Sequence, residues 1–415
     1  MSDAVRVIAL VLFLAPLVLI GIAYVGYPLL LALISAFQRR RSRLSDPAEW
    51  PMISLTVPAY NEQGSIRETL ESLLRLEYPA DRRQIVVISD ASTDETDAIV
   101  RSYAAHGVEL LRLPERRGKT AAENAAGAVV GGEIVVNIDA TVRVRSRSLK
   151  NLVRAFQDPA VGVASGRDVS TSNDGMQSTR GESGYVGFEM WVRSLETRFD
   201  SIVGASGCFY AIRRWLYDAQ FPEHLSRDFA SALIAKEHGL RAVSVDDAVC
   251  DVPRASLLRV EVQRKTRTMA RGLETLWYKR HLMNPLRYGR FALMLIGHKL
   301  CRWLVYPFLP GAIVGLVMLS FHSRAAAALL AFTGVAIMLG VAGMRWRERR
   351  TPVALAVPGF VVTLVAIIVS ASLRPYLLAS LLVDVGNDEL GRIGNGAGQG
   401  GLAPLLLVRE AGRAG

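Results

Sequence analysis

Long apolar stretches and mixed polar stretches divide this chain of 415 residues into distinct parts. Four stretches contain no Asp, Glu, Lys or Arg: residues 7–38, 303–321, 325–344 and 353–373. A helix needs roughly 20 apolar residues to cross a bilayer, so each stretch predicts a membrane-spanning helix. The first is much longer than the apolar core of a secretory signal peptide, roughly 7–15 residues. A cleaved signal peptide is therefore the less favoured alternative there.

The middle of the chain, residues 45–285, mixes apolar, polar and charged positions and predicts one folded domain. Apolar runs of strand length alternate in it with helix-like stretches. The predicted strands are 53–58, 84–89, 108–113 and 134–138, and the predicted helices are 64–76, 94–105 and 119–130. Alternating strands and helices favour an α/β fold with a mainly parallel sheet covered by helices.

Charge predicts an orientation for these parts. The chain has 49 Lys and Arg against 38 Asp and Glu, a net charge of +11. Basic clusters at 39–43, 279–302 and 345–350 flank the apolar stretches. Because basic flanks stay on the cytoplasmic side, we expect a multi-pass protein of the cell inner membrane with the 45–285 domain in the cytoplasm. The charge then indicates contact with anionic membrane lipid, and no nucleic-acid motif accompanies it.

The predicted organisation has five parts. They are an N-terminal transmembrane helix (7–38), the cytoplasmic domain (45–285), an interfacial amphipathic helix (286–302), about three C-terminal transmembrane helices (303–385) and a Gly-rich flexible tail (386–415). The chain has three widely spaced cysteines, which match neither a metal site nor a disulfide framework.

Polar side chains follow three of the predicted strands at the point where each strand ends. Tyr60 and Glu62 follow the first strand, Asp90 the second and Asp139 the fourth. Ligands of open parallel sheets bind beyond the carboxyl ends of the strands, so these residues predict a nucleotide or sugar-nucleotide site. Asp94 is better placed to cap the helix that follows it.

Seven short motifs follow one another in and after this domain. They are VPAYNE (57–62), SDASTDET (89–96), RRGKTAAEN (116–124), IDAT (138–141), IVGASGCFYAIRR (202–214), SRDF (226–229) and QRKTRTMARG (263–272). Their order resembles that of the family 2 glycosyltransferases, the membrane-bound group with cellulose, hyaluronan and poly-N-acetylglucosamine synthases. The resemblance covers about residues 50–310. It implies a GT-A-like, Rossmann-type, mainly parallel sheet domain inserted between transmembrane helices.

The resemblance implies a role for each matching residue. Asp228 would be the catalytic base, and Gly204, Ser206 and Gly207 would form the acceptor side. Asp139 would bind a divalent metal, Mg²⁺ or Mn²⁺, which prefers carboxylate oxygens. The residues implied to bind the donor nucleotide are Tyr60, Glu62, Asp90, Lys119, Asp139, Arg264 and Arg267.

The chain departs from the family pattern at four positions. Thr141 replaces the second Asp of the metal motif, so the metal would rest on Asp139 with substrate phosphates and water. Arg227 precedes the implied base where the family has Glu or Thr. With Arg267 at the family's Arg position, Arg264 replaces a Gln and Thr268 replaces a Trp. Structural alternatives stay open: Lys119 as a solvated surface residue, Asp228 as a helix N-cap, and the basic stretch around Arg267 as a membrane-surface helix.

We therefore expect an inverting glycosyltransferase that moves a sugar from a UDP-sugar to a hydroxyl of a carbohydrate or lipid-linked acceptor, in surface polysaccharide or glycolipid synthesis. One alternative is the transfer of a single sugar to a polyprenyl-phosphate or lipid carrier, which the missing Trp favours. Another is a non-catalytic nucleotide-binding subunit of an export complex. The sequence does not identify a partner subunit.

Overall fold

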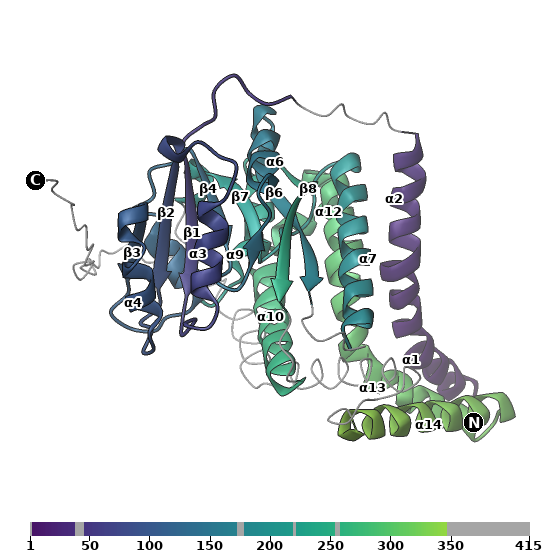
Figure 1. The fold of residues 1–415 in the computed structure, drawn as a ribbon. Helices are drawn as coiled ribbons and strands as arrows, with labels where there is room; N and C mark the ends of the chain where they lie inside the picture. The colour runs from purple at the N-terminus through teal and green to yellow at the C-terminus, as the bar shows by residue number, and fades with distance from the viewer. Residues whose placement is uncertain (1, 38–44, 172–177, 219–220, 254–257, 347–415) are drawn as a thin grey trace, which may run out of the picture. The chain divides into compact units, whose positions relative to one another are not determined.

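The computed structural model describes residues 2–37, 45–171, 178–218, 221–253 and 258–346 (Figure 1). These residues form two compact units. The sheet unit comprises the described residues among Ile34–Asn173 and Tyr185–Arg254, and the helical unit those among Met1–Leu33, Asp174–Gly184 and Ala255–Ala397. The predicted domain of 45–285 therefore ends earlier than expected, because the helix after residue 257 belongs to the helical unit.

One sheet of eight strands forms the centre of the sheet unit. The strands are β1 (Ile53–Ala59), β2 (Arg83–Ser89), β3 (Val108–Arg112), β4 (Ile134–Ile138), β5 (Arg143–Val144), β6 (Val161–Thr171), β7 (Phe209–Arg213) and β8 (Arg241–Pro253). Their order in the sheet is β3-β2-β1-β4-β7-β6-β8-β5. All four strands predicted from the sequence are present, each within one residue of its expected bounds.

The sheet is mainly parallel, as expected, but two of its eight strands, β7 and β5, are reversed. Strands β3, β2, β1 and β4 are parallel, as the alternation of strands and helices predicted. Strand β7 then runs antiparallel to both β4 and β6, and β5 runs antiparallel to β8. The pattern of short apolar runs cannot reveal this, because a buried strand has the same composition in either direction. The reversal lets the start of β7 meet the end of β4.

Helices cover both faces of the sheet, as Figure 1 shows. They are α3 (Ile66–Leu74), α4 (Thr96–Arg101), α5 (Lys119–Ala126), α6 (Ser148–Arg154), α7 (Ser178–Phe199), α8 (Arg214–Tyr217) and α9 (Arg227–Glu237). Alternate residues of each central strand enter different cores: Leu55 packs in one with α3 and α6, and Val135 in the other with α5, α8 and α9. Burial of both faces explains the continuous apolar runs in the sequence.

The site-bearing edge of the sheet lies at the carboxyl ends of β1, β2 and β4. Strand β1 lies between β2 and β4. The chain passes from β1 to β2 and β3 on one side, and then returns to β4 on the other side of β1. Open α/β sheets bind their ligands at such a switch point. Asn61 and Ala91, which follow β1 and β2, have positive φ angles of 54° and 57°. Non-glycine residues seldom adopt this conformation, and it is concentrated at functional sites.

The helical unit includes two continuous helices that are long and apolar enough to cross a membrane, Asp3–Ala36 and Arg290–Ser320. The first contains α1 (Asp3–Gly21), the π-helix η1 (Ile22–Gly26) and α2 (Tyr27–Ala36). The second contains α12 (Arg290–Leu295), the π-helix η6 (Ile296–Leu300) and α13 (Cys301–Ser320). The remaining described helices of this part are α10 (Leu258–Tyr278), α11 (Pro285–Tyr288) and α14 (Arg324–Trp346). Short 3₁₀ turns complete the fold at Ala80–Arg82, Ala104–His106, Ala155–Gln157 and Arg280–Met283.

One expectation for the C-terminal part needs correction. The predicted interfacial helix 286–302 is not a separate element, because the helix that begins at Arg290 continues without a break to Ser320. The stretch 325–344 lies in the helix α14 (Arg324–Trp346), and its membrane span stays a prediction. The predicted span 353–373 and the tail 386–415 lie outside the described residues.

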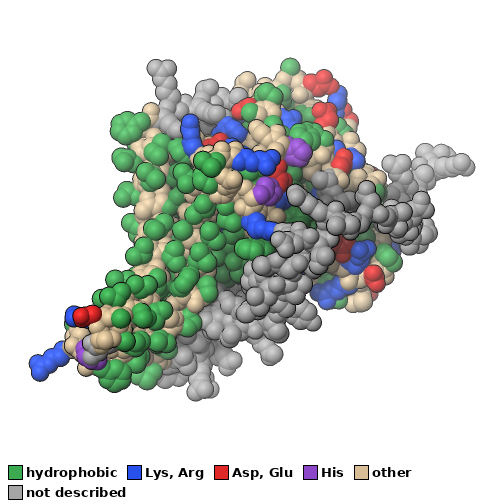
Figure 2. All heavy atoms as spheres, turned by 180° about the vertical axis from the view of Figure 1, so that it is seen from behind, with side chains coloured by type: hydrophobic (Ala, Val, Ile, Leu, Met, Phe, Trp, Pro, Cys, Tyr) green, Lys and Arg blue, Asp and Glu red, His purple; other side chains and the backbone are tan. Residues whose placement is uncertain are grey.

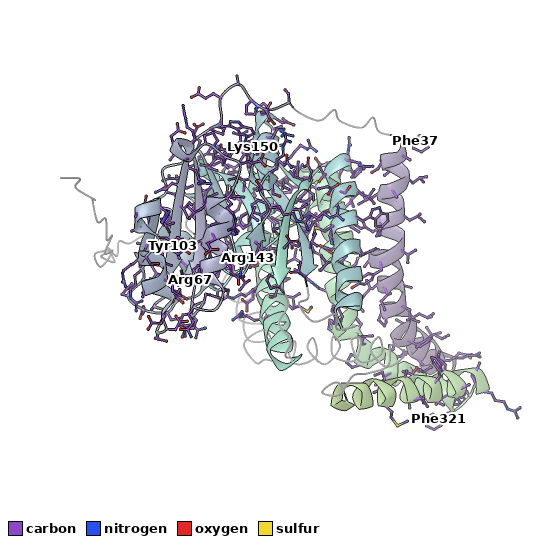
Figure 3. The ribbon with its side chains drawn as sticks, in the orientation of Figure 1. Phe37, Arg67, Tyr103, Arg143, Lys150 and Phe321 are labelled. Atoms are coloured by element: carbon purple, nitrogen blue, oxygen red, sulfur yellow. The ribbon has the colours of Figure 1, made fainter. Side chains whose placement is uncertain are left out.

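The surface of these helices is rich in apolar side chains, as Figure 2 shows. Leu29 on α2 is 65% exposed, and Phe321, at the end of α13 and labelled in Figure 3, is 79% exposed. Large exposed apolar patches mark contacts with a membrane or with another apolar partner. The two long helices and this surface suggest association with a membrane.

Candidate active site

A short loop before α5 is held by the carboxylate that follows β2. Asp90 is 4% exposed and accepts hydrogen bonds from the backbone N–H groups of Arg117 (2.8 Å) and Gly118 (2.7 Å). Gly118 has a φ of 97°, a conformation that favours glycine. In this state Asp90 therefore fixes the loop and the start of α5, so its predicted contact with a nucleotide base would be an additional one.

The ammonium group of Lys119 is the centre of the site. Its Nζ donates hydrogen bonds to Asp139 Oδ1 at 2.6 Å and to the backbone carbonyl of Gly207 at 2.7 Å. Burial acts to lower the pKa of Lys119, but Asp139, Glu123 and Asp228 outweigh it and hold that pKa well above its usual value. Lys119 is thus a fixed cation at the end of β4, and it is not a solvated surface lysine.

Asp228, the predicted base, lies in the first turn of α9 against the glycine that contacts Lys119. Ser226 Oγ donates a hydrogen bond to Asp228 Oδ1, and a Cβ added at Gly207 would lie 2.4 Å from Asp228 Oδ2. Asp228 and Asp139 both lie close enough to Lys119 to interact with its ammonium electrostatically. The N-cap of α9 is Ser226 and Asp228 is the second residue of the helix, so the N-cap alternative for Asp228 is wrong and its role as a base stays a prediction.

A buried carboxylate behind Lys119 was missed in the sequence. Glu123 on α5 is 1% exposed, and its Oε1 lies 4.0 Å from Lys119 Nζ. Burial raises the pKa of Glu123 to about 7, although Lys119 and Arg227 act to lower it. Glu123 follows Lys119 by four residues, so the two share one face of the helix. In the sequence, this spacing and the position of a charged residue among alanines were the available signal that Glu123 lies near the site.

Arg227 is the second buried charge that sequence reasoning left without a role. It is 5% exposed, and its guanidinium donates to Asn124 Oδ1 and to the backbone carbonyl of Tyr217. The same guanidinium lies over the Tyr217 ring, 4.2 Å from its centroid. Tyr217 in turn donates to the backbone carbonyl of Glu123 at 2.6 Å. Arg227 therefore ties α9 to α5 and α8 beneath the site.

The residues after β1 form a separate part of the site edge. The Tyr60 ring stacks against the Arg116 guanidinium, 3.8 Å from ring centroid to Cζ. Glu62 accepts from Ser65 Oγ at 2.6 Å, and burial raises its pKa. Arg116 was not predicted as a site residue. Its place beside Gly118 in a basic loop was the only signal.

The predicted acceptor loop, Gly204–Gly207, is buried and fixed from β6. Ser206 Oγ donates to both carboxylate oxygens of Asp168 at 2.7 and 2.8 Å, and the Ser206 N–H donates to Ser165 Oγ at 2.8 Å. The Asp139 N–H donates to the carbonyl of Cys208 at 3.1 Å. The loop and the end of β4 are therefore directly connected, and Asp168 is the positioning side chain that the sequence did not reveal.

Other predicted residues have different surroundings. Arg264 and Arg267 lie on α10, which belongs to the helical unit. Asp94 accepts from the N–H of Thr96 at 3.0 Å and so contacts the first residue of α4, although the N-cap position of that helix is Glu95. Arg143, labelled in Figure 3, pairs with a surface carboxylate of Glu68 at 2.7 Å.

Oxygen ligands for a cation are present at Asp139, although the residues that the structure describes contain no group of three His, Cys, Asp or Glu side chains suited to a metal. The Lys119 ammonium is itself a cation held between Asp139 Oδ1 and the Gly207 carbonyl. Both are hard oxygen donors of the kind that Mg²⁺ and Mn²⁺ prefer. One carboxylate fits a metal that takes its other ligands from substrate phosphates and water.

Comparison with known proteins identifies the class of this domain. Residues 54–220 match the family model described as glycosyl transferase family 2. This part of the chain therefore matches the family 2 glycosyltransferases, as the motifs indicated. A solved structure of a mannosyltransferase from Pyrobaculum calidifontis, in complex with GDP-Man and Mn²⁺, is similar with a TM-score of 0.68 and 25% identity, over 89% of this chain and 98% of that chain. The fold is accordingly GT-A-like.

Curated relatives match a smaller part of the chain. An N-acetylglucosaminyltransferase of a Rhizobium species is 27% identical over 221 residues, which is 48% of each chain. A beta-monoglucosyldiacylglycerol synthase of a Nostoc species is 28% identical over 173 residues, 41% of this chain and 37% of that protein. The matches thus span about half of these relatives or less.

A side chain at position 207 should displace Asp228. In a Gly207→Ala variant the new Cβ would meet Asp228 Oδ2 at 2.4 Å, too close for any contact, so the carboxylate must move. A shift of about 1 Å in a catalytic group can cost about 100-fold in rate. We expect sugar transfer to fall by about that factor while the melting temperature changes little. Transfer at the wild-type rate would contradict the placement of Asp228.

The buried carboxylate should make stability depend on pH. Between about pH 4.3, the ordinary value, and about 7, folded Glu123 keeps its proton while the unfolded chain releases it. Stability contributed by this group therefore falls as the pH rises through that window. Compared with wild type, Glu123→Gln should gain up to about 3 kcal/mol from pH 5 to 8.

Thermal unfolding from pH 5 to 8 tests this expectation. Glu109→Gln is the matched control, because Glu109 lies on β3, partly exposed, and accepts from Gln84 Nε2 at 3.2 Å. A difference between Glu123→Gln and wild type that stays constant across this range would show that Glu123 ionises at an ordinary pH.

Proposed function

We propose that this protein is an inverting glycosyltransferase that uses a nucleoside-diphosphate sugar and transfers the sugar to a hydroxyl group. One observation carries the proposal: Lys119, Asp139 and Asp228 converge on Gly207 at the switch point of a GT-A-like sheet. A fixed cation, a carboxylate that can hold a metal and a second carboxylate suited to accept a proton are the groups that such a displacement needs.

The arrangement supports a single in-line displacement. The acceptor oxygen attacks the anomeric carbon, its proton passes to Asp228, and the bond from the anomeric carbon to the diphosphate oxygen breaks. The Lys119 ammonium stabilises the negative charge that develops on the departing diphosphate. A divalent metal held by Asp139 would supply further charge stabilisation there. Covalent catalysis would need a second nucleophilic carboxylate, which the proposed mechanism does not use.

The donor is proposed to be a UDP-sugar, as the resemblance to the family's synthases implies. Tyr60, stacked on Arg116 at the end of β1, offers an aromatic face for the base. The similar mannosyltransferase was solved with GDP-Man and Mn²⁺, so guanosine donors belong in the same test. Mg²⁺ and Mn²⁺ are both proposed as the metal.

The acceptor is proposed to be a surface polysaccharide or a glycolipid at the membrane. The two long apolar helices support the proposal that the protein is anchored in the cell inner membrane, and the basic flanks are the reason to propose a cytoplasmic sheet unit. Transfer of one sugar to a lipid carrier is the second candidate. It is favoured by the likeness to a beta-monoglucosyldiacylglycerol synthase and by Thr268 in the place of the family's Trp.

Removal of the proposed base should stop transfer and spare binding. For Asp228→Asn we expect sugar transfer to fall by about 10²–10⁴-fold, the usual contribution of general base catalysis, while nucleotide affinity stays within a few-fold of wild type. Nucleotide release by the protein in lipid nanodiscs, with a panel of UDP- and GDP-sugars, measures both the donor and the effect. Wild-type turnover in the variant would exclude Asp228 as the base.

Loss of the proposed metal ligand should weaken donor binding and metal response together. Asp139→Ala also frees Lys119 from its closest carboxylate, so some donor affinity should survive without metal. We expect the stimulation of transfer by Mn²⁺ to disappear. An unchanged Mn²⁺ dependence would place the metal on other residues, and binding of nucleotide without any transfer by the wild type would support the non-catalytic subunit instead.

A further inference from the structure

Lys119 lies between two carboxylates of very different accessibility. Asp139, whose side chain is 33% exposed, holds the ammonium at 2.6 Å. Glu123, which is 1% exposed, lies on the other side with its Oε1 at 4.0 Å. That oxygen has no hydrogen-bond partner among the described residues. A buried carboxylate oxygen without a partner is costly, so its place beside a lysine calls for an explanation.

The proposed metal creates a conflict at Asp139. A divalent cation and an ammonium would both need the same carboxylate, and like charges that share one site repel each other. The ammonium would have to leave Asp139 Oδ1 when the metal binds. Glu123 Oε1, 4.0 Å from Lys119 Nζ, is the nearest carboxylate oxygen described around that ammonium apart from Asp139.

The surroundings of Glu123 suit a carboxylate that receives a cation. Arg227 and Asp228 interact with it from α9, Lys119 from its own helix and Asp139 from the end of β4. Arg227 is engaged by Asn124 and by the carbonyl of Tyr217, so its guanidinium is held in place. On the sheet side, Tyr210 of β7 is fully buried and its hydroxyl also lacks a partner among the described residues.

We propose that Glu123 is a positioning residue that accepts the Lys119 ammonium when Asp139 takes up the metal of the donor complex. This inference rests on the proposed function, because it assumes that the metal binds at Asp139. In this mechanism Lys119 moves from the exposed carboxylate to the buried one and stays next to the site. The chain thereby keeps a positive charge beside the departing diphosphate without a direct clash with the metal.

Calorimetric titration with UDP, and separately with GDP, tests the inference without any turnover. The measured quantity is the ratio of the nucleotide Kd without Mn²⁺ to the Kd with saturating Mn²⁺, for the full chain in nanodiscs. In Glu123→Gln the ammonium has no second carboxylate, so the ratio should fall about tenfold, a change of about 1.4 kcal/mol. Glu109→Gln, at the amino end of β3, should keep the wild-type ratio.

A double variant separates positioning from a general structural effect. In Lys119→Gln/Glu123→Gln no ammonium competes for Asp139, so the ratio should return to at least the wild-type value, although the nucleotide binds more weakly overall. A merely structural defect at Glu123 would persist in the double variant. Melting temperatures of all variants confirm that each is folded.

The outcomes distinguish this inference from the proposed function. A wild-type ratio of one would overturn the metal assignment, and this inference with it. A wild-type ratio well above one that Glu123→Gln leaves unchanged would overturn this inference alone. That second result would mean that Lys119 moves onto the diphosphate, and that Glu123 has no part in metal binding.

Discussion

The hydrogen bonds of the Lys119 ammonium join three parts of the chain that are separate in sequence, and a fourth part lies against one of them. Lys119 begins α5, Asp139 follows β4, Gly207 precedes β7, and Asp228, which lies against Gly207, is in the first turn of α9. Each group is polar, and each is brought to the same edge by a strand or helix that packs through buried apolar residues. The elements could be packed without this contact, but the carboxylates would then repel one another across the site.

The hydrogen bonds of Lys119 to Asp139 and Gly207 can form because of the direction of β7. Because β7 runs antiparallel to β4, its first residues lie beside the last residues of β4, and the Cys208 carbonyl accepts from the Asp139 N–H. A parallel strand in the same place would start at the opposite edge and carry Gly207 away from Asp139. The mixed sheet is therefore a requirement of the site. The close approach of Asp228 to Gly207 adds a second requirement, since a Cβ at position 207 would force the Asp228 carboxylate to move.

The sequence predicted the parts of this site that follow from local patterns. Strand ends marked by polar residues gave Asp90, Asp139 and the residues after β1, because side chains at the ends of buried strands must face solvent or ligand. Glu123 and Arg227 escaped prediction because their burial depends on helices α5, α8 and α9 packing together, which no local pattern encodes. The antiparallel direction of β7 was not predicted either, because no local sequence pattern encodes it. Arg264 and Arg267 were predicted from the motif order alone, and the fold assigns their helix to the other unit.

The buried carboxylate of Glu123 beneath the site needs a physical explanation. An ionised Glu123 without a hydrogen bond to its Oε1 weakens the folded state, and an apolar residue in its place would pack without that cost. Arg227 offsets part of the charge but is engaged by Asn124 and Tyr217, so it does not neutralise Glu123 through a direct pair. A group that destabilises the fold and lies next to the Lys119 ammonium is better explained by function than by folding. Its location behind Lys119, away from the acceptor loop, associates that function with the charge of the donor diphosphate.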